Sequence, residues 1–219
     1  MPQGKQYFIM GATWLLFACS NSNNTEIASE PAEQKETITQ TCKYSYDNAS
    51  THLYWTAFKH SGRVEVKGQM DSLKVNGTVA AGTIINAIKN ASIIIYPGSV
   101  DSKDPGRDQK INSFFFGSMI ATEEITGSIK SIDGSNKNGT GIISLTLNNV
   151  SQDVKMEYVI EEETIQFRCD LDFMDWKCTD AIANLQKACE EKHTGIDGKT
   201  VFWPNAKILI ETTLIKDCK

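Results

Sequence analysis

Residues 165–173 carry the most regular pattern in this 219-residue chain, an alternation of apolar and polar side chains without a fault. Such alternation predicts a β-strand with one face buried and one face in water, as antiparallel sheets commonly have. We therefore expect Phe167 and Leu171 to face inward and line the interior of the protein. Arg168 and Asp170, on the opposite face, should be exposed to water.

Seven further segments alternate less regularly and are also expected to be strands. They are separated by residues that favour tight turns, such as the pairs Asp133-Gly134 and Asn138-Gly139. Many short strands in series predict a barrel or a sandwich. The expected strands cover residues 51–58, 63–70, 91–100, 124–132, 139–148, 152–160 and 206–215.

Three stretches depart from the strand pattern. Residues 179–192 gather apolar side chains, Leu185 among them, on one side of a helix and end with Lys192 in the last turn. This segment is predicted to be an amphipathic helix. Residues 109–119 form an apolar patch that could be a helical turn plugging an opening, and residues 80–90 could form a third helix.

The N-terminal residues have the layout of a secretory signal. An apolar run from Tyr7 to Ala18 follows Lys5 and is too short to span a membrane. The run ends in Leu16-Phe17-Ala18-Cys19, which resembles the bacterial lipobox, whose cysteine receives acyl groups such as palmitate and becomes the mature N-terminus. We therefore expect residues 1–18 to be a lipoprotein signal peptide and Cys19 to be the lipidation site. The alternative is an ordinary signal peptide with an incidental cysteine.

The segment after the signal is expected to be a tether. Residues 19–41 begin with the lipidated cysteine and continue as a polar, acidic stretch nearly free of aromatic side chains, which cannot bury enough apolar surface to fold. Residues 42–219 are then one folded domain of ordinary size. The lipobox predicts that this domain lies in the bacterial cell envelope, lipid-anchored and on the periplasmic side.

Charge and motifs exclude several classes of function. The net charge of −5 comes without a basic stripe, so we expect no nucleic-acid partner. A phosphate-binding glycine loop, a His-Glu-x-x-His motif and a Gly-x-Ser-x-Gly motif are all lacking, and we expect no enzymatic activity. Asp170, Asp172 and Asp175 lie close in sequence, but the first two belong to the solvent face of their strand and have no base or nucleophile beside them.

Five cysteines remain besides Cys19, so at least one of them is not paired with another. Cys42 opens the first strand-like segment and Cys218 closes the last, and their pairing would fit two antiparallel neighbours at the seam of a closed sheet. Cys178 and Cys189 should not pair, because eleven helical residues separate them by roughly 16 Å.

A metal site is not expected. Cys189 and His193 are four residues apart and could share one face of a helix, but two ligands do not make a site. A half-buried cysteine and a histidine interacting with the helix end are the preferred explanation of the pair.

Several segments, taken in order, resemble the YceI-like family of extracytoplasmic proteins that bind polyisoprenoids. The resemblance covers about residues 44–216 and includes helix and loop features of a lipoprotein subset. Three positions depart from the family pattern, namely Met70, Phe115 and Asn149. The matching segments are Tyr46-Asp47, Trp55-Thr56-Ala57, Gly68, Ser99-Val100-Asp101, Arg107-Asp108, Ile111 to Phe116, and Gly141 to Val154.

The resemblance implies an all-β fold, a lipocalin-like antiparallel β-barrel of about eight strands with an amphipathic helix in its C-terminal half. It also implies a ligand, an apolar isoprenoid or related lipid of the quinone or prenyl phosphate type. The alternative is a structural or stress-response envelope module with a packed interior. The expected partners are this lipid and the membrane; whether the chain forms a homodimer is left open, and no cofactor is expected apart from a bound lipid.

The same resemblance suggests the residues of the site. Arg107 could present a positive charge to a phosphate or quinone head group. Alternatively, Arg107 and Asp108 cap a turn or a helix start. The residues expected to line the pocket are Trp55, Phe115, Phe116, Phe167, Leu171, Phe173, Ile208 and Ile210.

Overall fold

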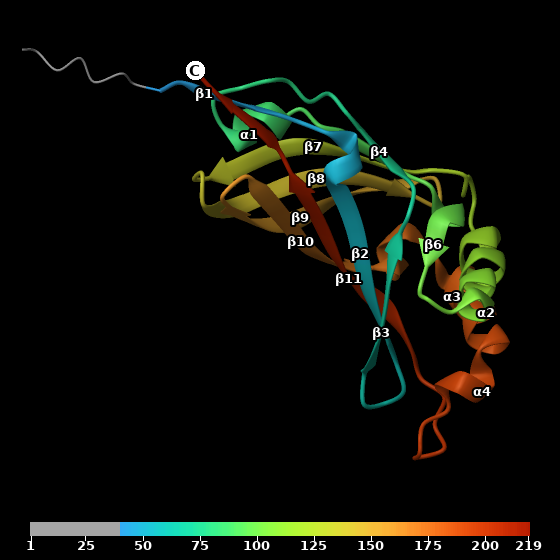
Figure 1. The fold of residues 1–219 in the computed structure, drawn as a ribbon. Coiled ribbons are helices and arrows are strands. Elements are labelled where there is room, and N and C mark those ends of the chain that lie inside the picture. The colour runs from blue at the N-terminus through green and yellow to red at the C-terminus, as the bar shows by residue number, and fades with distance from the viewer. Residues whose placement is uncertain (1–39) are drawn as a thin grey trace, which may run out of the picture. The chain divides into compact units, whose positions relative to one another are not determined.

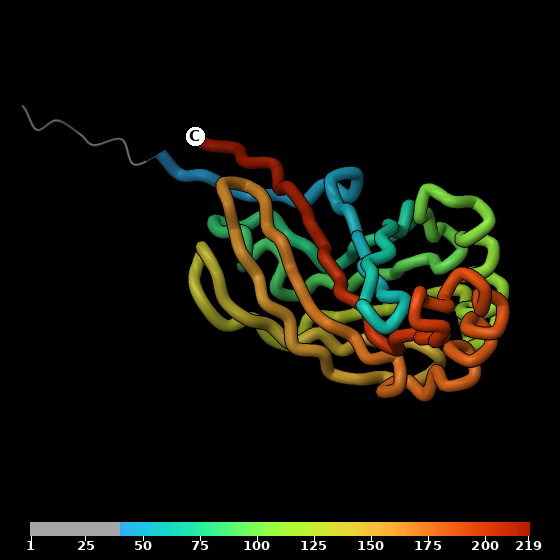
Figure 2. Tube along the Cα trace, turned by 90° about the horizontal axis from the view of Figure 1, so that it is seen from below, coloured from blue at the N-terminus to red at the C-terminus, as the bar shows by residue number. Residues whose placement is uncertain are grey.

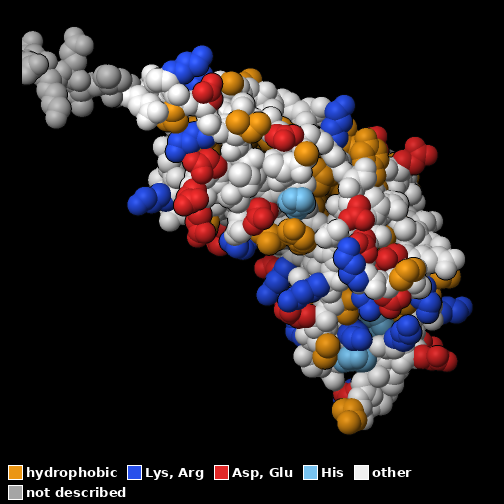
Figure 3. Space-filling model, viewed as in Figure 1, with side chains coloured by type: hydrophobic (Ala, Val, Ile, Leu, Met, Phe, Trp, Pro, Cys, Tyr) orange, Lys and Arg blue, Asp and Glu red, His pale blue; other side chains and the backbone are white. Residues whose placement is uncertain are grey.

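A computed structural model describes residues 40–219 of the chain (Figure 1). The expected signal peptide, the lipidation site Cys19 and nearly all of the expected tether lie outside these residues. Within the described part of the chain, no helix is long and apolar enough to cross a membrane. Acidic and basic side chains are interspersed on the face shown in Figure 3.

The described residues form one large antiparallel sheet, in which each strand hydrogen-bonds to its neighbours. The spatial order of the strands is β4-β5-β7-β8-β9-β10-β11-β2-β3-β6. Their bounds are β2 (Thr51–Lys59), β3 (Val64–Met70), β4 (Leu73–Asn76), β5 (Ser92–Ile95), β6 (Val100–Asp101), β7 (Ile125–Gly134), β8 (Asn138–Leu147), β9 (Val150–Glu161), β10 (Thr164–Asp172) and β11 (Phe202–Thr213).

The two ends of this strand order meet, because two of the strands are bent. Only Asp71 and Ser72 separate β3 from β4, and only residues 96–99 separate β5 from β6. Across the bends the Asp71 N–H donates to Ser99 O (3.0 Å) and the Tyr96 N–H donates to Ser72 O (3.1 Å). If each bent strand is counted once, the sheet has the eight strands expected, and it curls into the barrel-like form seen in Figures 1 and 2.

Most of the strands follow the sequence pattern. In β10, Phe167 and Leu171 are buried while Arg168 and Asp170 are exposed, so the predicted facing is confirmed. The prediction of one continuous strand over residues 91–100 is wrong, because a 3₁₀ turn at Pro97–Ser99 divides the segment into β5 and β6. Proline has no N–H for a strand ladder, which accounts for the break.

The structure differs from the sequence-based prediction in two smaller segments. Strand β4 was not expected, because its four residues are too few to show a period. Phe173 belongs to a 3₁₀ turn, Phe173–Trp176, and not to the strand before it. The side chain of Asp172 accepts from the Met174 N–H (3.0 Å) and so caps this turn.

Helices gather mainly at one end of the sheet. The turn-like plug expected at 109–119 is present as α2 (Pro105–Lys110), a π-helix (Ile111–Phe115) and a 3₁₀ turn (Phe116–Ser118). The expected amphipathic helix ends early, as α3 (Thr179–Ala188), and α4 (Glu190–His193) follows after Cys189. These segments lie at the end away from β1 and the C-terminus (Figures 1 and 2). The third expected helix is α1 (Ile84–Ile88), near the opposite end.

The β8–β9 turn contains one of the departures from the family pattern. Asn148 and Asn149 both have positive φ, 50° and 55°. Asparagine tolerates this conformation better than other residues with a side chain, and two-residue hairpin turns require it. Asn149 can therefore occupy a turn position at which glycine is customary.

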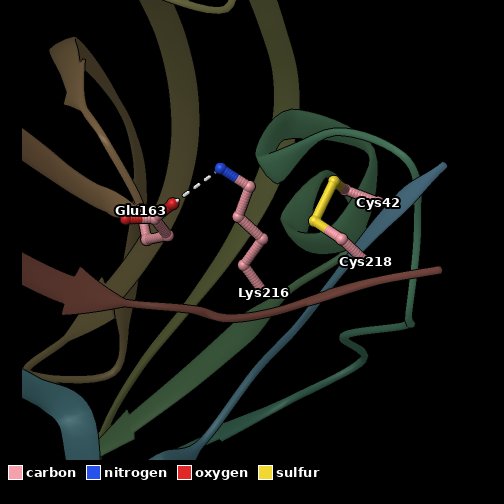
Figure 4. Close-up of a disulfide and its surroundings, with 4 residues drawn as sticks. All are labelled: Cys42, Glu163, Lys216 and Cys218. Atoms are coloured by element: carbon pink, nitrogen blue, oxygen red, sulfur yellow. Dashed lines mark hydrogen bonds and ion pairs between the residues drawn. A yellow bond between two sulfur atoms is a disulfide. The ribbon is translucent and has the colours of Figure 1, made fainter. Parts of the chain in front are cut away.

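A two-stranded sheet ties the ends of the domain together. Strand β1 (Cys42–Ser45) pairs antiparallel with β12 (Ile215–Cys218), and Cys42 lies directly opposite Cys218. The two cysteines form a disulfide, and the neighbouring Lys216 makes an ion pair with Glu163 at 2.9 Å (Figure 4). The other described cysteines, Cys169, Cys178 and Cys189, take part in no disulfide among residues 40–219.

Candidate ligand cavity

The curled sheet and the helical end enclose an apolar cavity of about 170 Å³. No charged side chain lines it, and Asn205 is the one residue of the lining with a side-chain amide. The lining comprises Leu53, Trp55, Ala57, Met70, Ile93, Ile95, Val100, Ile111, Phe115, Phe116, Ile125, Ile143, Leu145, Leu147, Val154, Met156, Cys169, Leu171, Phe173, Leu185, Phe202, Trp203, Asn205, Ala206, Ile208 and Ile210.

Seven of the eight residues expected to line a pocket are in this lining. The exception is Phe167, which faces inward from β10 but lines a second, smaller cavity of about 60 Å³. The expectation that Phe167 lines the main pocket is therefore corrected. Its ring packs against Tyr158, with the ring centroids 5.9 Å apart. Cys169, two residues further along β10, already lines the main cavity.

Most of the cavity wall is formed by strand residues that alternate between the inner and outer faces of the sheet. In β8 the residues Ile143, Leu145 and Leu147 share the inner face, and in β9 Val154 and Met156 do so. Their period-2 pattern is the same signal that identified β10. These five residues were not named from the sequence, although the alternation of residues 139–148 would have found the first three.

Aromatic side chains line the cavity at the helical end. Phe115 packs edge-on against Phe116 and Phe173, with centroid distances of 5.1 and 5.0 Å. Such edge-to-face pairs are the favoured arrangement of aromatic rings. Hydrogen bonds from Lys110 Nζ to Ala188 O (2.7 Å) and from Asn184 Nδ2 to Ser118 Oγ (2.9 Å) join α2 and the 3₁₀ turn Phe116–Ser118 to α3.

The β2–β3 hairpin and the start of β11 form a further part of the wall. The Arg63 guanidinium lies over the rings of Phe58 and Trp203, at 4.1 and 4.3 Å from the ring centroids. The Trp203 Nε1–H donates to His60 O at 2.9 Å. Cation–π contacts on two rings hold the Trp203 side chain at the cavity lining.

Arg107 is not among the residues of the cavity lining. Its guanidinium lies near Asp104, with Nη2 and Oδ2 3.4 Å apart, and near Ser102 O. Asp108 accepts hydrogen bonds from the Ser102 N–H (2.9 Å) and Oγ–H (2.6 Å). The pair therefore supports the start of α2, which is the alternative to a head-group role.

Cys169 is the one thiol in the cavity lining. Burial, with a smaller effect of Asp170, raises its pKa to about 11. The side chain is therefore a neutral thiol at physiological pH and behaves as a small apolar group.

His193 lies beside Phe202, a residue of the cavity lining. Its ring stacks on Phe202 with the centroids 5.2 Å apart, and the His60 ring is 6.5 Å away. Burial lowers the pKa of His193, and the positive charge of Lys59 lowers it further. Among residues 40–219, no three His, Cys, Asp or Glu side chains are grouped as metal ligands would be.

The antiparallel, barrel-like fold defines a class of proteins to which several known structures belong. A protein from Burkholderia cenocepacia, BcnA, has 11% identity and a TM-score of 0.53 over 79% of this chain and 99% of its own. A polyisoprenoid-binding domain from Saccharophagus degradans, implicated in plant cell wall breakdown, has 14% identity and a TM-score of 0.51 over 79% and 98%. At such low identity these likenesses show the fold alone.

Residues 44–201 match the YceI-like domain family. The chain therefore belongs to the YceI-like family. No curated protein sequence matches the chain.

Proposed function

We propose that this protein binds one apolar lipid of the isoprenoid type, such as a quinone or a prenyl phosphate, inside its barrel. The observation that carries the proposal is the cavity of about 170 Å³, whose lining has no charge and a single amide. Transfer of each methylene from water to such surroundings contributes roughly 0.8 kcal/mol. A few isoprene units can therefore bind with micromolar affinity without polar contacts.

The polyisoprenoid-binding domain from Saccharophagus degradans supports the class of ligand, since its fold is similar. The protein acts by holding its ligand and not by chemistry. The exposed Asp170 and Asp172 lie on the outer face of β10, away from the cavity, and the Cys169 thiol has a raised pKa.

The proposed setting is the bacterial cell envelope, with the barrel held at a membrane on the periplasmic side by acyl groups on Cys19. The signal-like run and lipobox support this proposal. A lipid-anchored barrel would meet its ligand at the membrane, where isoprenoids reside.

The test is organic extraction of the protein purified from its native membrane, followed by mass spectrometry. One isoprenoid lipid per protein is the expected result, and the emptied protein should take up a fluorescent prenyl probe. The alternative function, a structural envelope module with a packed interior, predicts neither a stoichiometric lipid nor uptake of the probe.

A further inference from the structure

The second cavity, of about 60 Å³, adjoins the first inside the same barrel. Four residues line both cavities, Ile93, Ile143, Met156 and Ile210. These side chains therefore form the partition between the two spaces. The main cavity lies beneath the helical end, and the second one reaches toward α1.

Met156 is the one residue of the partition whose side chain can turn aside readily. The other three are β-branched isoleucines, which are restricted at χ1. Methionine is unbranched and flexible, and it fills irregular gaps. Met156 is almost fully buried, at 3% exposure, so its movement would open one cavity to the other and not to solvent.

Three residues of the second cavity's lining, Tyr46, Thr51 and Thr212, are linked to one another by their hydroxyl groups, and the surface that they present to the cavity is apolar. Tyr46 Oη is 2.6 Å from Thr51 Oγ1, and Thr51 Oγ1 donates to Thr212 Oγ1 at 2.8 Å. All three residues line this cavity, and Thr51 and Thr212 are buried. Their hydroxyls are satisfied by one another, so an apolar chain would have to break these bonds to pass further.

We propose that the second cavity receives the terminal part of an isoprenoid chain whose body lies in the main cavity. Met156 acts as the gate between the two, and the hydrogen-bonded side chains of Tyr46, Thr51 and Thr212 mark where the chain must stop. The barrel would thus set an upper limit to the length of chain that adds to the affinity. This inference rests on the proposed function and adds a length preference to it.

The test measures how well linear prenols of increasing length displace a dansyl-labelled geranyl probe. The series runs from farnesol through geranylgeraniol to solanesol. For the wild-type protein, affinity should rise with each added isoprene unit until both cavities are filled, and then stay level.

Ala91→Leu is the main variant, because Ala91 lines only the second cavity and leucine would fill it. The affinity of this variant for the shortest prenol that displaces the probe should stay within about twofold of the wild-type value. The gain in affinity of about tenfold that the wild-type protein shows for longer prenols should be lost. Ala57→Leu is the matched control, since Ala57 lines only the main cavity. That variant should weaken binding of all the prenols by a similar factor.

Met156→Ile tests the gate by another route and covers the case in which Ala91→Leu does not fold. Isoleucine has a similar volume and suits the strand, but its branched side chain cannot turn aside. This variant, too, should bind longer prenols no more tightly than the shortest one.

The outcomes separate the two proposals. If Ala91→Leu weakens all prenols by the same factor as Ala57→Leu, or leaves every affinity unchanged, the length inference is wrong while lipid binding stands. If the wild-type protein binds no prenol of any length, the proposed function is wrong and the length inference fails with it.

Discussion

Gly68 of β3 lies directly against the indole of Trp55 on the neighbouring strand β2. A Cβ placed on Gly68 would be 2.3 Å from Trp55 Cζ2 and 2.7 Å from Asp101 O. Trp55 also lines the cavity and donates its Nε1–H to Gln69 O at 3.3 Å. Because Gly68 has no side chain, the indole of Trp55 can lie against β3 and form part of the cavity wall.

Gly68→Ala should destabilise the protein by roughly 1–3 kcal/mol, because the new methyl group overlaps a ring and a backbone carbonyl, which cannot both move away freely. The free energy of unfolding in urea measures the effect. Gly62→Ala is the control, since nothing lies within 4 Å of a Cβ at Gly62. Equal stabilities of the two variants would show that the close packing at Gly68 is not a constraint.

The disulfide between Cys42 and Cys218 should be present in the mature protein. The two residues are 176 positions apart, and the entropy model gives roughly 4 to 5 kcal/mol for a loop of that order, although measured values are often smaller. Peptide mapping without reduction checks the pairing. Recovery of Cys218 linked to Cys169, Cys178 or Cys189 would contradict it.

Lipidation of Cys19 is a prediction from the sequence. In cells fed a clickable fatty acid, the wild-type chain should be labelled. The Cys19→Ser chain should stay unlabelled, and it should be either uncut or released from the membrane. Labelling of the variant at the wild-type level would show that another residue carries the lipid, or that the label is not specific.

His193 should make the stability of the protein depend on pH. Its pKa in the folded protein is below the ordinary value of 6.5, so at lower pH the unfolded chain binds a proton more readily than the folded one. Stability should thus be unaffected by this group well above pH 6.5 and fall as the pH drops through 6.5 toward the lowered pKa.

Thermal unfolding between pH 5 and pH 8, a range set about the ordinary histidine pKa, measures the effect. His193→Gln should remove part of the decrease at acidic pH. His52→Gln serves as the control because His52 is exposed on β2. If both substitutions change the pH profile equally, the burial of His193 is not its cause.

The sequence predicted the frame of the fold because strands half-buried in a barrel leave a period-2 pattern. Residues 164–172 show this best, since every inward position is apolar and most of the outward ones are charged. The bends at Asp71 and at Pro97 were not foreseen, because a strand that turns a corner loses its period there. Short strands such as β4 carry too few residues for any pattern.

The site was predictable only in part, for a different reason. Alternation shows that Phe167 and Leu171 face inward, but it does not say how far along the barrel each one lies. Only the register of β10 against β9 and β11 places Leu171 in the main cavity and Phe167 in the second. In the same way, the charge of Arg107 suggested a head group, while its position near Asp104 depends on the helix start.

The central claim, that the barrel interior is the lipid site, is tested most directly by uptake of a fluorescent prenyl probe into Leu171→Trp and Asp170→Trp. The two positions are neighbours on β10, but Leu171 lines the cavity and Asp170 faces water. Leu171→Trp should fill the cavity and abolish uptake, and Asp170→Trp should bind as the wild type does, with both variants folded by circular dichroism. Equal uptake by the two folded variants would contradict the account.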